Sequence, residues 1–192
     1  ITGVIGYLGI VSGIAIGASI FRPRTAVLFA SVYGIFIAGW RIGLLMGEEI
    51  LWLERIQIMV DRLLAIFAQL TRQQAVTDNF LFLTLMALLY WGLSAYAGYQ
   101  LARHANPWRT SLPMGLALVV IHHYDAFLAG RVWYLVLYLF FSIILVARLA
   151  FLKYQERWQR SNTYMPPYLG VDFVRIALIA TTLLLALSWA AP

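Results

Sequence analysis

Two adjacent histidines are the residues of this sequence best suited to hold a cofactor. His122, His123 and Asp125 form a cluster of titratable side chains beside apolar sequence. A neutral imidazole inside a membrane can ligate a haem iron or the magnesium of a chlorophyll-type pigment, or carry a proton. The cluster also lies where an apolar segment ends, next to Tyr124, and polar residues are expected there without any ligand. We favour this structural interpretation, and adjacent helical residues point about 100° apart, which makes a shared metal unsuitable.

Glycines recur at every fourth position in two stretches, and this spacing predicts close contacts between helices. The two sets are Gly9, Gly13 and Gly17, and then Gly39, Gly43 and Gly47. Residues four apart lie on one helix face, and a face without side chains allows another helix to come close. We therefore predict that the first two apolar segments pack on one another. A flat or rod-like hydrophobic ligand could use the same groove, but helix packing is the favoured interpretation.

The elements that position these residues follow from composition. The chain has 192 residues, of which 62% are hydrophobic and 11% charged, with a mean hydropathy of +0.81. A soluble domain has about 25% charged residues, so the sequence predicts an all-α integral membrane protein. Cysteine is absent, which excludes disulfides, thiolate metal sites and a cysteine nucleophile within this stretch. Because no nucleophile–base pair or phosphate-binding glycine loop is found, we predict no enzymatic activity.

Six transmembrane helices are predicted from the apolar runs. They lie near 1–21, 25–47, 80–101, 111–124, 132–147 and 174–191. The fourth and fifth are shorter than the roughly 17 residues that a span usually needs. We expect them either to form a tight hairpin that thins the bilayer or to be extended at their ends.

The segment 48–72 has a different pattern, because its charges recur seven residues apart on one helical stripe. Glu54 and Arg55 are followed at that interval by Asp61 and Arg62, while apolar residues fill the other face. This pattern predicts an amphipathic helix lying in the membrane interface. A surface helix packed on the transmembrane helices fits the pattern equally well.

Charge distribution predicts the orientation. Of the 14 Lys and Arg residues, nine fall in loops after the first, third and fifth predicted spans. Cytoplasmic loops collect such residues, so we interpret the net charge of +6 as topology and expect no nucleic-acid partner. The prediction is a multi-pass membrane protein with both ends of the sequence on the extracytoplasmic side. A further span before Ile1 would place a native N-terminus in the cytoplasm.

Several local features from residue 51 onward resemble a known family. They are Trp52 with Asp61-Arg62-Leu63, Asp78-Asn79-Phe80 and Tyr96-Ala97, Asn106-Pro107-Trp108 with Leu112 to Leu118, Arg148-Leu149, Glu156-Arg157-Trp158, Tyr164, Leu169 to Asp172, and Ser188 to Pro192. Their order and spacing resemble the N-terminal membrane region of bacterial transglutaminase-like membrane proteins. The resemblance implies a helical anchor in the bacterial cytoplasmic membrane, followed by an extracytoplasmic domain with a cysteine–histidine–aspartate triad. Since this chain lacks cysteine, no catalytic residue is carried over.

Two functions are therefore expected from the sequence. The first is a non-catalytic anchoring and scaffolding domain, part of a longer transglutaminase-like protein, that contacts the lipid bilayer and packs against other membrane subunits. The alternative is an accessory subunit of a larger photosynthetic membrane complex that binds carotenoid or bacteriochlorophyll. No cofactor is required by the first function, although bound lipid is expected in both.

Overall fold

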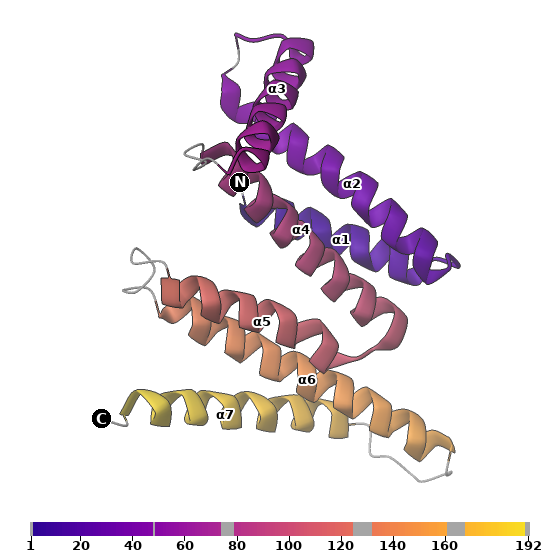
Figure 1. Cartoon of the computed structure of the whole chain (residues 1–192). Helices are drawn as coiled ribbons and strands as arrows, with labels where there is room; N and C mark the ends of the chain where they lie inside the picture. The colour runs from indigo at the N-terminus through magenta and orange to yellow at the C-terminus, as the bar shows by residue number, and fades with distance from the viewer. Residues whose placement is uncertain (1, 48, 74–78, 125–131, 161–167, 191–192) are drawn as a thin grey trace. The chain divides into compact units, whose positions relative to one another are not determined.

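The computed structural model describes residues 2–47, 49–73, 79–124, 132–160 and 168–190. These residues are nearly all helical and contain no strand, which confirms the predicted all-α class. The helices within them are α1 (Thr2–Ala18), α2 (Pro23–Gly43), the 3-10 turn η1 (Leu44–Met46), α3 (Trp52–Thr71), α4 (Asn79–His104), α5 (Pro107–Tyr124), α6 (Trp133–Arg160) and α7 (Leu169–Ala190), shown in Figure 1.

Local sequence explains where several helices begin and end. Proline occupies the first helical position of α2, where its missing N–H costs nothing and its fixed φ suits a helix. In α5 the preceding residue, Asn106, accepts a hydrogen bond from the backbone N–H of Arg109 at 3.2 Å and caps the helix. Gly47 follows η1 with a φ of +94°, a conformation that residues with a side chain rarely adopt.

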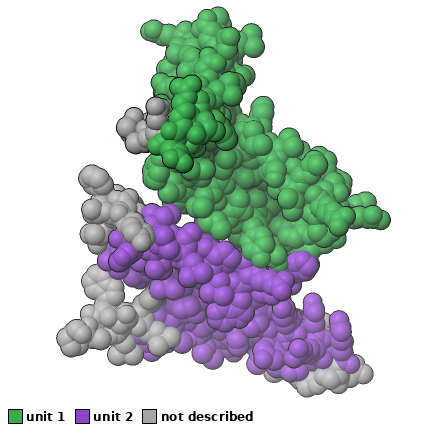
Figure 2. Space-filling model, in the orientation of Figure 1, with its two compact units in different colours: residues 1–103 green, residues 104–192 purple. Residues whose placement is uncertain are grey.

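The chain divides into two compact units, residues 1–103 and residues 104–192, which Figure 2 colours separately. Unit 1 contains α1 to α3 and nearly all of α4. In unit 2, α6 packs against both α5 and α7. The single polytopic domain predicted over 1–192 stays a prediction, and each unit is described by itself.

Three helical stretches are long and apolar enough to cross a membrane, among the residues that the structure describes. They are Pro23–Met46, Asn79–His104 and Trp133–Trp158, and α1 contributes a shorter apolar helix, Gly3–Ala18. The coarse prediction of a helical protein with membrane-spanning segments is therefore supported, whereas six spans stay a prediction.

Each predicted segment corresponds to a helix, although some bounds differ. The largest difference is the fifth segment, predicted as 132–147, because α6 continues to Arg160. Charged residues from Arg148 onward ended the predicted apolar run, but arginine and lysine are good helix formers and continue the same helix. The segment 48–72 forms α3, while Glu48 and Asp78 lie outside the described residues.

The core of unit 1 lies where α1, α2 and α4 meet. Ile5, Ala38, Trp91 and Ala95 are buried there, and Ile66 brings α3 to the same cluster. Trp91 also donates a hydrogen bond from its indole Nε1 to the carbonyl oxygen of Ala30 at 2.8 Å. This contact joins α4 to α2.

Candidate helix-packing and ligand-binding site

The first glycine set lies against α4 rather than against α2. A Cβ built on Gly13 would lie 2.1 Å from the carbonyl oxygen of Ala95, and one built on Gly9 would lie 2.8 Å from the Cβ of Ser94. Gly17 meets Ala102 at 2.9 Å in the same way. All three glycines thus face one helix, and the two backbones are in direct contact.

Helix α4 contributes a glycine of its own to this contact. A Cβ on Gly98 would lie 2.4 Å from the carbonyl oxygen of Ile10 and 2.9 Å from the backbone nitrogen of Ile14. A real Cβ does not come this close to backbone atoms. Small residues on both helices therefore set the separation of α1 and α4.

The second glycine set does not form a continuous contact. A Cβ on Gly39 or Gly47 would meet nothing within 4 Å, whereas one on Gly43 would lie 2.9 Å from the indole of Trp52. Gly43 thus receives the start of α3, and the other two glycines lie in open space. Four-residue spacing placed these residues on one face, but it did not say which of them had a neighbour.

A different series of small residues on α2 faces α4. Ala26, Ala30, Gly34 and Ala38 recur at every fourth position, and the indole of Trp91 of α4 lies at Ala30 and Gly34. A Cβ on Gly34 would lie 2.5 Å from both Cδ1 and Nε1 of that indole. This face was not predicted from the sequence because three of its four residues are alanines, although a small residue at every fourth position was the available signal.

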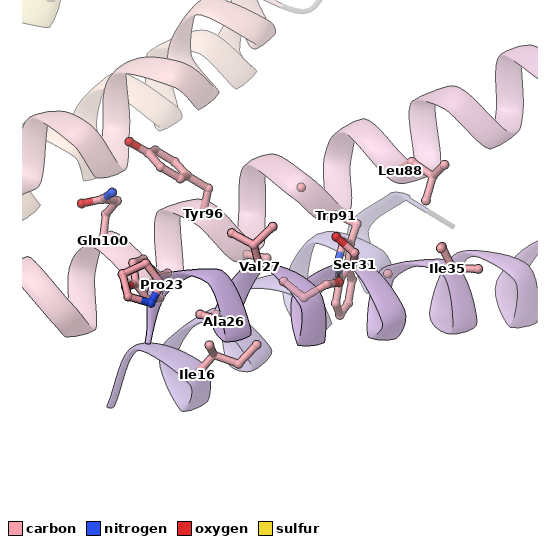
Figure 3. Close-up of a pocket in the computed structure, with 16 residues that line it drawn as sticks. Ile16, Pro23, Ala26, Val27, Ser31, Ile35, Leu88, Trp91, Tyr96 and Gln100 are labelled. Carbon is pink, nitrogen blue, oxygen red and sulfur yellow. Dashed lines mark hydrogen bonds between the residues drawn. The ribbon is translucent and has the colours of Figure 1, made fainter. Parts of the chain in front are cut away.

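A groove of about 530 Å³ runs between α2 and α4 beside Trp91, within unit 1. Figure 3 shows Gln100 and Pro23 at one end, with Leu88 and Ile35 at the other. Apolar and small side chains form most of its lining, and its volume falls within the range of about 300–1,000 Å³ that is typical of ligand sites. The groove is a candidate site for a long apolar molecule.

One polar group in the lining has no partner. Gln100 is 7% exposed, and its side-chain amide oxygen is buried without a hydrogen-bond donor. Buried polar atoms are nearly always paired, and an unpaired one costs about 1–3 kcal/mol. Gln100 therefore places an unpaired amide group at the Pro23 end of the groove.

A buried arginine connects the far end of α2 to α3. The Arg55 guanidinium donates to the carbonyl oxygens of Ile50, at 2.8 Å, and Gly43, at 3.2 Å. It also lies 4.9 Å from the ring centroid of Trp52. Hydrogen bonds from a charged donor are stronger than neutral ones, so this side chain adds to the packing of Trp52 and Ile66 in fixing the angle between the two helices.

The two candidate ligand histidines lie in the last turn of α5, in unit 2. His122 is half-buried, His123 is exposed, and Asp125 lies outside the described residues. Within the parts of the chain that the structure describes, no three His, Cys, Asp or Glu side chains are grouped to hold a metal ion. Pigment ligation by either histidine stays a prediction.

Unit 2 packs with larger side chains than unit 1. The Tyr138 hydroxyl of α6 donates to the carbonyl oxygen of Ser111, and the same ring lies 3.1 Å from where a Cβ on Gly115 would be. On the other side of α6, the rings of Phe151 and Phe173 lie 5.3 Å apart. Rings and one tyrosine hydroxyl thus fill the contacts that small residues fill in unit 1.

Comparison with known proteins gave no relative. No family model matches this chain, and no curated protein or solved structure matches it either.

Proposed function

We propose that this chain is a non-catalytic domain that anchors and scaffolds a larger assembly in a membrane. The observation that carries the proposal is the apolar outer surface of α2. Val27, Leu28, Ile35 and Phe36 are all more than half exposed on a helix long enough to span a bilayer. Apolar surface in water is unfavourable by about 25 cal/mol per Å², so lipid tails or partner helices are the natural contacts.

Helix α3 supports the proposal because it presents three different faces. Arg55 and Ile66 are buried against the other helices of unit 1. A second face exposes large apolar side chains at helical spacing, namely Leu53, Ile56, Val60, Leu64 and Phe67. The polar residues Gln57 and Asp61 lie on the third face, beside the apolar one. A helix lying in the membrane interface needs this combination of neighbouring apolar and polar faces.

The proposed orientation places the turn between α1 and α2 in the cytoplasm and α3 on the extracytoplasmic side. Because residues 1–192 contain no cysteine, single cysteines at Ile20 and Gln57 of this chain give a direct test. Both residues are exposed. An impermeant maleimide applied to intact cells should label Gln57→Cys and leave Ile20→Cys unlabelled until the membrane is opened. Labelling of both from one side would refute the orientation.

Cross-linking in native membranes tests the scaffolding function itself. A photo-reactive residue replacing Phe36, whose ring is exposed, should give a defined adduct with another membrane protein. A matched replacement at Ile20, in the turn outside the helices, serves as the control for random capture. Adducts with lipid alone at Phe36 would contradict a scaffold that packs against partner helices.

The link to transglutaminase-like membrane proteins is part of the proposal and depends on the motif resemblance. The complete reading frame tests it directly. A downstream domain with a cysteine–histidine–aspartate triad would support the anchoring function, and a different domain would remove this part of the proposal.

The second candidate function is an accessory subunit that binds carotenoid or bacteriochlorophyll. The groove between α2 and α4 favours it, as does the half-buried position of His122 in the last turn of α5. The glycine face of α1, however, is filled by α4. Visible absorption of the purified chain tests the function, and a colourless, fully helical preparation would count against it. If a pigment is bound through a histidine, His122→Leu or His123→Leu should shift its band.

A further inference from the structure

We propose that the groove between α2 and α4 is a specific site for an anionic phospholipid, with one acyl chain in the groove and the phosphate at its arginine-rich end. This proposal rests on the membrane placement of the proposed function but does not require a protein partner. The lipid site and the scaffolding function can therefore fail separately.

The dimensions of the groove fit an extended chain. The lining runs from Pro23 to Ile35 on α2 and from Leu88 to Gln100 on α4, and the two ends correspond in Figure 3. Twelve helical residues span about 18 Å. Along this length α2 contributes small side chains, so the bottom of the groove is smooth. A flexible acyl chain matches this shape and this apolar lining.

The polar features gather at one end. Gln100 lines this end, and its buried amide oxygen lacks a donor. A rotation of this side chain toward the groove would let a headgroup or glycerol hydroxyl supply one. Pro23, the first residue of α2, lines the same end. The first N–H groups of a helix have no partner within the helix and favour a negative charge. No side chain caps α2, since Arg22 makes no capping hydrogen bond.

Three arginines lie within three residues of the two residues that line this end, and they supply the charge. Arg22 and Arg24 flank Pro23 and are exposed. Arg103 follows Gln100 by three residues, and its guanidinium donates to the carbonyl oxygen of Ser19 in the turn before α2. Arginine forms paired hydrogen bonds with phosphate oxygens, and these are stronger than bonds between neutral groups.

The opposite charge is found elsewhere. The acidic residues that the structure describes in unit 1 are Glu49, Glu54 and Asp61, and all follow the other end of α2. A second copy of this chain or a neutral polyene would fill the apolar part of the groove. Neither would use three arginines and an unpaired amide oxygen together, which is why an anionic phospholipid is the occupant we infer.

Native mass spectrometry of the purified full chain tests the site. Phosphatidylglycerol and phosphatidylcholine with identical acyl chains are added in turn, and the fraction of protein with one bound lipid is measured. We expect phosphatidylglycerol to be retained at least about tenfold more strongly, because only its charge is uncompensated. Equal retention of the two lipids would overturn the proposal, as would a bound pigment or a second protein copy that phosphatidylglycerol does not displace.

A pair of matched variants locates the binding. Gly92 lines the groove and a Cβ there meets nothing within 4 Å, so Gly92→Phe should fill the groove without a clash. Gly39 is equally open but lies outside the lining, so Gly39→Phe is the control. We expect Gly92→Phe to lose about tenfold or more of the phosphatidylglycerol binding while the control binds normally. Equal binding by both folded variants would overturn the proposal.

A second pair of variants tests the phosphate end of the site without changing the groove. Arg22→Gln with Arg24→Gln changes exposed side chains only, and Arg62→Gln with Arg72→Gln removes the same charge from α3 and its end. The first double variant should bind phosphatidylglycerol no better than phosphatidylcholine, while the second should keep the wild-type preference. A preference that survives the first double variant would overturn the assignment of the phosphate to this end.

Discussion

Two faces of α4 show how small residues can either close a helix contact or leave it open. Towards α1, glycines on both helices meet, and Gly13 and Gly98 bring backbone against backbone. Towards α2, the small residues are on one helix only, and α4 presents the large ring of Trp91. That ring holds the two helices apart and leaves the groove beside it. A series of small residues therefore predicts tight packing only when the residues opposite it on the facing helix are small as well.

The largest loss of stability is expected at the contact between α1 and α4. Gly13→Leu should force α1 away from α4, because even a Cβ would lie 2.1 Å from the Ala95 carbonyl oxygen. Overpacking typically costs about 1–3 kcal/mol and occasionally more, and we expect a loss near or above 3 kcal/mol. Thermal unfolding in detergent, followed by circular dichroism, measures it. Gly39→Leu is the control, since its side chain would enter open space, and an equal loss in both variants would refute the comparison.

A smaller effect is expected where α3 joins α2. Arg55→Met removes two hydrogen bonds from a buried charged donor, and such bonds contribute about 1.5–3 kcal/mol. We expect about 2 kcal/mol less stability, with faster proteolysis around α3. Arg72→Met, an exposed residue at the end of the same helix, should change stability by less than about 0.5 kcal/mol. Similar losses in the two variants would mean that Arg55 does not fix this junction.

The open face gives a still smaller effect. Trp91→Phe keeps an aromatic ring against α2 but removes the hydrogen bond to the Ala30 carbonyl oxygen. A single neutral hydrogen bond contributes about 1 kcal/mol, so the unfolding midpoint should fall modestly. Trp40→Phe, on an exposed indole, controls for the change of ring. A midpoint that falls no further for Trp91→Phe than for this control would contradict the bridging role.

The smallest effect should have the opposite sign. Gly39→Ala places a methyl group in open space within a helix, where alanine is favoured over glycine by about 1 kcal/mol. We expect a slight stabilisation there. Gly98→Ala should instead destabilise, since its Cβ would meet the Ile10 carbonyl oxygen at 2.4 Å. Chemical denaturation in mixed micelles measures both, and two changes of the same sign would show that the two helix faces are not different.

Much of the fold could be predicted because it depends on composition and on local sequence signals. The apolar runs predicted the helices, and Pro23 marked the start of α2. The amphipathic segment 48–72 became α3. Its third face, which is buried through Arg55, could not be predicted, since an arginine at that position looks like part of the polar stripe. Its carbonyl partners come from the end of α2 and the turn that follows it.

The site was harder to predict than the fold. The two glycine sets are identical in spacing, yet Gly9, Gly13 and Gly17 are packed against α4 whereas Gly39 and Gly47 meet nothing. Spacing specifies a helix face but carries no information on which helix lies opposite. The groove could not be predicted for the same reason. It needs small residues on α2 and a large ring opposite them on α4, and the sequence does not show that these two helices face one another.

The Arg55 hydrogen bonds have a consequence for how force would pass through the protein. Both carbonyl acceptors lie in the chain between the end of α2 and the start of α3, on either side of Gly47 and its left-handed backbone. The Arg55 guanidinium thus connects the chain segments on the two sides of that glycine. Tension applied to α3 by a membrane surface would therefore reach α2 through this guanidinium as well as through the packed side chains of Trp52 and Ile66.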